Sequence, residues 1–95
     1  HAEGYEKGTV FINDGAANAL AASDKAVSVL PVGVTRIEGD FEKGDIVRLV
    51  RDDGSQSGQA LGYGMAQYND TRARELIGLT NQKPLIHYDY LFLKQ

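Results

Sequence analysis

The 95-residue chain contains no cysteine and no tryptophan, only one methionine and only two prolines. Without cysteine the chain can form neither a disulfide nor a thiolate metal site, and nothing points to an oxidising compartment. No hydrophobic run approaches the ~18 residues that a membrane-spanning helix needs, and no signal-peptide pattern opens the chain. A cytoplasmic protein with no membrane partner is therefore the expectation.

An excess of positive charge is also missing. Ten basic and thirteen acidic residues give a formal net charge of −3. Proteins dedicated to nucleic acid are usually basic, because contacts with phosphates supply most of their non-specific affinity. The balance here disfavours tight binding of RNA or DNA, although it leaves room for a local basic patch.

The length and the hydrophobic content of 42% are those of one globular domain. The first residue is His1 rather than methionine, so the chain could be part of a longer protein. We interpret residues 1–7 as an amino-terminal extension or a cloning remnant, and residues 8–95 as the domain.

Short β-branched and aromatic runs between turn residues indicate a mainly β fold. The expected strands are 9–12, 26–34, 46–51, 56–68 and 85–93. Pro31 places the second of these at a sheet edge or a bulge. Two short helices are expected, one at 16–22 with Asp14 as its N-cap, and one at 72–77 that follows 69–71 and stops at Gly78. Five strands with several internal glycines and two short helices fit a small mixed β-barrel.

One long motif carries more information than the rest. Leu30-Pro31-Val32-Gly33-Val34 is followed by Gly39-Asp40-Phe41 and by Gly44-Asp45-Ile46-Val47, in the pattern LPxGVxxxxGDFxxGDxV. This pattern resembles the PUA domain, most closely the one at the carboxyl terminus of glutamate 5-kinases. Further resemblance lies in 11–16, 64–69, 72–78 and 87–89. The resemblance covers most of 8–93 and implies the PUA pseudo-barrel.

Two features depart from that pattern. Only residues 79–86 separate the second helix from the last strand, where the family carries a longer segment, and Tyr88 stands where the family has arginine after the histidine. Both departures fall in the carboxyl-terminal region, so they bear on contacts with the rest of such an enzyme.

The resemblance implies a non-catalytic, regulatory domain of a glutamate 5-kinase. In that family a separate amino-acid-kinase domain phosphorylates glutamate with ATP in proline synthesis. This chain has no room for that domain, so the fragment itself is not expected to be an enzyme or to hold a cofactor. The implied partner is the kinase domain of the parent chain, with homo-oligomers possible through the parent.

The alternative is an RNA-binding module, because PUA domains of RNA-modifying enzymes receive RNA between the first helix and the Leu-Pro-x-Gly segment. By resemblance, that groove would be lined by Gly15, Ala16, Lys25, Leu30, Pro31, Val32 and Gly33. Only one of these residues is basic, and Asp14 would place a negative charge at the helix start. RNA is therefore the less favoured hypothesis.

No residue pattern indicates catalysis or a metal. Gly62-Tyr63-Gly64 lacks the rest of a phosphate loop, and the carboxylates of Asp40, Glu42 and Asp45 are typical of solvated turns. His87, two residues before Asp89 in an apolar strand, is interpreted as structural.

Overall fold

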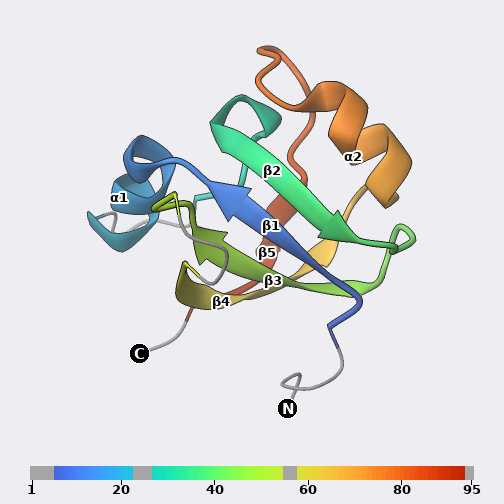
Figure 1. Ribbon diagram of the computed structural model, residues 1–95, viewed down its shortest axis with the longest axis horizontal. Helices are drawn as coiled ribbons and strands as arrows, with labels where there is room; N and C mark the ends of the chain where they lie inside the picture. The colour runs from blue at the N-terminus through green and yellow to red at the C-terminus, as the bar shows by residue number, and fades with distance from the viewer. Residues whose placement is uncertain (1–5, 23–26, 55–57, 94–95) are drawn as a thin grey trace.

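The computed structural model describes residues 6–22, 27–54 and 58–93, which build one five-stranded sheet and two α-helices (Figure 1). In chain order, the elements are β1 (Gly8–Ile12), α1 (Asp14–Ala22), the 3₁₀ helix η1 (Pro31–Gly33), β2 (Val34–Gly39), β3 (Ile46–Arg51), β4 (Gln59–Ala66), α2 (Asp70–Leu76) and β5 (Ile86–Leu93). Four of the five expected strands and both helices are confirmed, with 56–57 outside the described residues.

The strand order in the sheet is β2-β1-β3-β4-β5, and β1 and β3 are its one parallel pair within the described residues. Register shifts occur in three of the ladders, at Phe11/Ile12, Leu49/Val50 and Gly64/Ala66. Bulges of this kind bend strands and increase their twist, so the sheet coils around its own core. The mixed sheet with two short helices confirms the predicted pseudo-barrel.

The core is a cluster that draws buried side chains from both helices and from every strand. It contains Val10, Ile12, Ala17, Leu20, Val29, Val34, Ile37, Phe41, Val47, Leu49, Ala66, Ala73, Leu85 and Ile86. Of these residues, α1 supplies Ala17 and Leu20, and α2 supplies Ala73. Helices of two turns are marginal on their own, so α1 and α2 are stabilised mainly by this packing.

Gly62 and Gly64 allow β4 and β5 to lie close together. A Cβ on Gly62 would collide with the Phe92 carbonyl oxygen, and one on Gly64 would collide with the Ile86 side chain. These glycines are therefore structural, as their position inside a strand predicted.

The predicted strand at 26–34 is wrong. Residue 26 lies outside the described residues, Val29 makes only an isolated bridge to Ile86, and Pro31 begins η1. The Gly33 N–H donates to the Leu30 carbonyl oxygen at 3.0 Å, which closes the turn. Proline is favoured at the first position of a helical turn because its φ is already suitable and it has no N–H to satisfy.

The strand missing from the prediction is β2, which follows η1 directly. Only Val34 and Ile37 of this strand are buried, three residues apart, because the bulge opposite Ile12 shifts the alternation. The period-2 pattern that marks a half-buried strand is therefore absent from its sequence.

The second helix follows its prediction. The Asn69 side chain accepts a hydrogen bond from the Arg72 N–H at 2.8 Å, and Gly78 has a positive φ of 78° just beyond the end. Within the described ranges, neither helix has the length and apolar character needed to cross a membrane.

Candidate functional site

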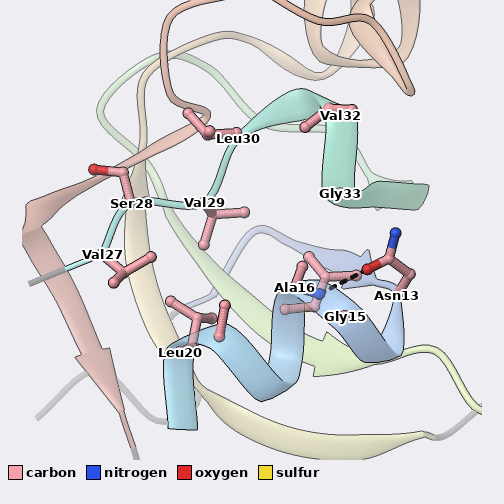
Figure 2. A pocket seen from close by; sticks show the side chains of 12 residues that line it. Asn13, Gly15, Ala16, Leu20, Val27, Ser28, Val29, Leu30, Val32 and Gly33 are labelled. Carbon is pink, nitrogen blue, oxygen red and sulfur yellow. Dashed lines mark hydrogen bonds between the residues drawn. The ribbon is translucent and has the colours of Figure 1, made fainter. Parts of the chain in front are cut away.

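The first helix, η1 and the segment before η1 enclose a pocket of about 330 Å³ (Figure 2). Five of the seven residues predicted for the ligand groove line it, namely Gly15, Ala16, Leu30, Val32 and Gly33. Pro31 is buried in η1 and is not among the lining residues. Lys25 lies outside the described residues. That these residues bind a ligand stays a prediction.

Asn13 ties the two walls of this pocket together. Its backbone N–H donates to the Gly33 carbonyl oxygen at 2.9 Å, and its side-chain Oδ1 accepts from the Ala16 N–H at 2.7 Å. The residue therefore caps α1 and holds η1 against the start of the helix.

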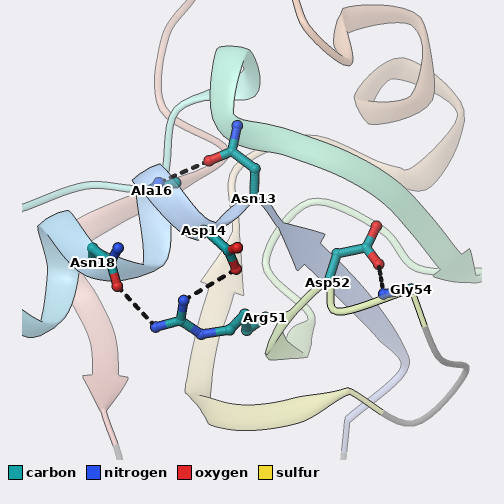
Figure 3. Close-up of polar contacts among 7 residues, drawn as sticks. All are labelled: Asn13, Asp14, Ala16, Asn18, Arg51, Asp52 and Gly54. Carbon is teal, nitrogen blue, oxygen red and sulfur yellow. Dashed lines mark hydrogen bonds and ion pairs between the residues drawn. The ribbon is translucent and has the colours of Figure 1, made fainter.

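Asp14, which the sequence predicted as the cap, lies inside the helix instead. Its carboxylate forms an ion pair with the Arg51 guanidinium at 3.1 Å, and Arg51 also donates to the Asn18 side chain (Figure 3). Asp14 is not the cap because an N-cap side chain must accept a hydrogen bond from a backbone N–H two or three residues ahead. Asn13 meets that need at Ala16.

Gly33 lies directly beside Ala16, where η1 meets the start of α1 at the edge of the pocket (Figure 2). A Cβ placed on Gly33 would lie 2.8 Å from the Ala16 Cβ, closer than two carbon atoms approach without displacement. The absence of a side chain at residue 33 is therefore what allows η1 to sit this close to α1.

The described lining of the pocket is neutral and mostly apolar. Its polar side chains are Asn13 and Ser28, and both already make hydrogen bonds, the Ser28 Oγ accepting from the Tyr88 N–H at 3.0 Å. Leu30 and Val32 at the pocket are each 45% exposed. The described walls thus suit an apolar group better than a phosphate.

Among the described residues, the carboxyls of Asp52 and Asp70 have shifted pKa values, and neither residue lines this pocket. The Thr35 hydroxyl donates to Asp52 at 2.6 Å, which lowers the pKa of this carboxyl. The Gly54 N–H, which also donates to Asp52 (Figure 3), adds to the effect. Desolvation raises the pKa of Asp70, but the Phe41 N–H and the Arg74 guanidinium outweigh it and leave the pKa lowered.

The described residues offer no metal cluster, since nowhere among them do three His, Asp or Glu side chains gather closely enough to hold an ion. Asp45 instead accepts the Glu42 N–H at 2.9 Å and shapes the turn between β2 and β3. The Asp89 N–H donates to His87 Nδ1 at 3.1 Å, so this hydrogen bond is local to β5, and the structural role expected for His87 stays a prediction.

The sequence interpretation missed other lining residues. Asn13 carried a usable signal, because asparagine directly before an alanine-rich helix is a favoured N-cap. Val27, Ser28 and Val29 carried none, since their approach to α1 depends on the pairing of Val29 with Ile86.

A family model of the PUA domain matches residues 8–85. The chain belongs to the PUA domain family. It is 48% identical over 91 residues to a glutamate 5-kinase of Chlorobaculum tepidum, and 47% identical over 94 residues to one of Bacteroides thetaiotaomicron. These matches cover 96% and 99% of this chain, but only 24% and 25% of the two relatives.

Solved structures agree with the family. A PUA domain from Aeropyrum pernix K1, described as a tartrate complex, has a TM-score of 0.71 and 25% sequence identity, with 85% of this chain and 41% of that one covered. The chain is thus similar to a PUA domain that accounts for about a quarter of each of the two curated relatives.

Proposed function

We propose that this chain is the non-catalytic, regulatory PUA domain of a glutamate 5-kinase. One observation carries the proposal: 48% identity extends over 96% of this chain and over only 24% of the relative. The ATP-dependent phosphorylation of glutamate in proline synthesis is then the work of an amino-acid-kinase domain in the remainder of the parent protein. The domain described here would adjust that activity and the assembly of the parent.

An exposed aromatic face on β5 supports a docking role. Tyr88, Tyr90 and Phe92 are 46%, 43% and 64% exposed, and Phe92 pairs with Tyr63 of the neighbouring strand. Exposed aromatic side chains that gather along one edge strand are typical of interaction sites in soluble proteins. We assign this face, Tyr63 with Tyr88, Tyr90 and Phe92, to contact with the kinase domain, since about three quarters of each relative lies outside the region matched here.

RNA binding in the pocket beside α1 is not favoured, because no lysine or arginine lies in its described lining. A phosphate backbone needs cationic partners, and Arg51, the nearest arginine to the start of α1 that the ion pairs identify, is already paired with Asp14.

The first test is the gene around this chain. The proposal expects an amino-acid-kinase domain encoded in the same reading frame, before residue 1. Finding the chain alone, or joined to an unrelated domain, would refute it.

The second test compares the full-length parent with a version that lacks this domain. Glutamate-dependent consumption of ATP, inhibition by proline and molecular mass are measured for both. Glutamate phosphorylation is expected to survive deletion, with altered proline inhibition or altered mass. Loss of the chemical step in a folded kinase domain, or phosphorylation by the 95-residue chain alone, would contradict the accessory role.

A Tyr88→Ser/Phe92→Ser double variant of the parent then tests the proposed docking face. It should reproduce the effect of the deletion on proline inhibition or mass. The matched control is Lys7→Ala, an exposed change outside that face.

A further inference from the structure

The positive charges of this domain are unevenly neutralised. All five arginines form ion pairs with carboxylates: Arg36 with Glu38, Arg48 with Glu6, Arg51 with Asp14, Arg72 with Glu75 and Arg74 with Asp70. Three lysines are described, namely Lys7, Lys43 and Lys83. Within the part of the chain that the structure describes, neither Lys43 nor Lys83 forms an ion pair.

Lys43 and Lys83 line the same pocket, although forty positions separate them in the chain. The pocket has a volume of about 520 Å³, and its other lining residues are Gln67, Tyr68, Pro84 and His87. No aspartate or glutamate lies in its described lining. On a molecule with a net charge of −3, this pocket therefore collects cationic and hydrogen-bonding groups without a carboxylate between them.

Hydrogen bonds hold both lysine-bearing segments beside β4. The Tyr68 hydroxyl donates to the Lys83 carbonyl oxygen at 2.9 Å, and the Gln67 N–H donates to the Leu85 carbonyl oxygen at 2.8 Å. On the other side, the Gly44 N–H donates to the Ala66 carbonyl oxygen at 2.8 Å. The backbone at both lysines is thus fixed, and only the side chains need to adjust to a ligand.

His87 adds a hydrogen-bond donor to this wall. Its Nδ1 accepts the Asp89 N–H at 3.1 Å, which leaves Nε2 as the ring nitrogen that can donate to a ligand. The Oδ2 of Asp89 lies 3.5 Å from Nδ1, but Asp89 is not a lining residue.

We propose that this pocket, lined by Lys43, Gln67, Tyr68, Lys83 and His87, binds a small oxyanion, the carboxylate or phosphate group of a small molecule. Two ammonium groups supply charge and the His87 imidazole supplies a directed N–H donor, while the Gln67 amide, which already donates to the Met65 carbonyl oxygen at 3.3 Å, retains one further N–H. Such charge-assisted hydrogen bonds are the stronger ones available to a protein. The proposal does not depend on the parent being a kinase, because it rests on this chain alone.

A nucleic acid fits these observations less well. A polynucleotide is held by many phosphate contacts along a track of cations, whereas here two lysines and one histidine meet at one place. Each described arginine that could extend such a track is already paired with a carboxylate.

The test is an NMR titration of the 95-residue chain with inorganic phosphate and, separately, with citrate, at constant ionic strength maintained with sodium chloride. Saturable shifts of the backbone amides of Lys43, Gln67, Tyr68, Lys83 and His87 are expected with at least one anion. Saturation by phosphate alone identifies a phosphate site, and saturation by citrate alone identifies a carboxylate site.

Lys43→Ala and Lys83→Ala should each weaken binding about fivefold, as expected for the loss of one exposed charge partner. The double variant should abolish saturation. Lys7→Ala, which removes an equal charge from an exposed lysine outside the pocket, should leave the affinity unchanged. The amide spectrum of each variant shows at the same time whether it is folded.

Three results would overturn the proposal. These are shifts that do not saturate with either anion, equal weakening by Lys7→Ala, and saturation by a structured RNA hairpin when neither small anion binds. The last result would assign the pocket to nucleic acid instead.

Discussion

Replacing Gly33 with alanine tests how the pocket beside α1 is built. The new Cβ would lie 2.8 Å from the Ala16 Cβ. A methyl carbon on a helix has no torsion through which it can turn away, so relief requires η1 and α1 to separate. That movement would strain the hydrogen bond from the Asn13 N–H to the Gly33 carbonyl oxygen, now 2.9 Å long.

The cost follows from this geometry. Adding one carbon to a well-packed contact destabilises a protein by about 1–3 kcal/mol. For a domain of this size, each kcal/mol lowers the melting temperature by roughly 4–8 °C. Gly33→Ala should therefore melt several degrees below the wild type, and Gly33→Val, with a larger side chain, should melt lower still.

The assay is thermal unfolding followed by circular dichroism, with urea unfolding as a second measure. Gly15→Ala is the matched control, because Gly15 lines the same pocket. Its added Cβ would meet the Asn13 Oδ1 at an ordinary 3.5 Å. Alanine is the better helix former by about 0.5–1 kcal/mol, so this variant should be as stable as the wild type or more so.

If Gly33→Ala melts at the wild-type temperature, with unchanged amide shifts in α1 and η1, the close approach of these elements is wrong. Equal destabilisation by both variants would instead indicate a general intolerance of the pocket to added volume.

Further predictions concern the turns and caps. Asn13→Ala should lower the free energy of unfolding by about 0.5–2 kcal/mol, because α1 loses its cap. Asp14→Ala should lower it by less than ~1 kcal/mol, because only an exposed ion pair is removed. Urea midpoints compare the two variants, and the opposite order would show that Asp14 is the cap. Gly44→Ala should lower the free energy of unfolding by about 1–2 kcal/mol through backbone strain alone, since Gly44 has a φ of 97° and no atom lies within 4 Å of a new Cβ. An unchanged midpoint in urea unfolding would show that the turn relaxes. The pKa of Asp52 is lowered in the folded state, so its ionised form stabilises the fold above the ordinary carboxyl pKa of about 3.9, and that stability is lost as pH falls through the lower folded-state value. Asp52→Asn should therefore be less stable than the wild type at pH 7 and closer to it at pH 2, and Thr35→Val should show the same trend; a difference independent of pH would contradict the role of this hydrogen bond.

Local signals in the sequence were enough for several elements. The strand at 46–51 has the bounds that its alternating pattern predicts, and α2 begins after Asn69 and ends before Gly78 as its cap and stop residues indicate. In each case the residues that decide the structure lie within a few positions of one another. The long spaced motif from Leu30 to Val47 also sufficed to identify the family, which the match over 8–85 confirms.

Other features depend on contacts between distant residues. η1 is held partly by the hydrogen bond from the Gly78 N–H to the Pro31 carbonyl oxygen, and β2 loses its alternation because of a bulge against β1. The five groove residues that were predicted from resemblance do line one pocket, but its neutral character is visible only once its other walls are in place.

The sequence by itself therefore determined the fold class, the helix caps of α2 and the family, because those depend on local propensity and ordered motifs. Only the tertiary structure decided which charges remain unpaired. Every described arginine forms an ion pair with a carboxylate. Lys43 and Lys83 instead line one pocket, because the hydrogen bonds of Gly44, Gln67 and Tyr68 bring their two segments to opposite sides of it.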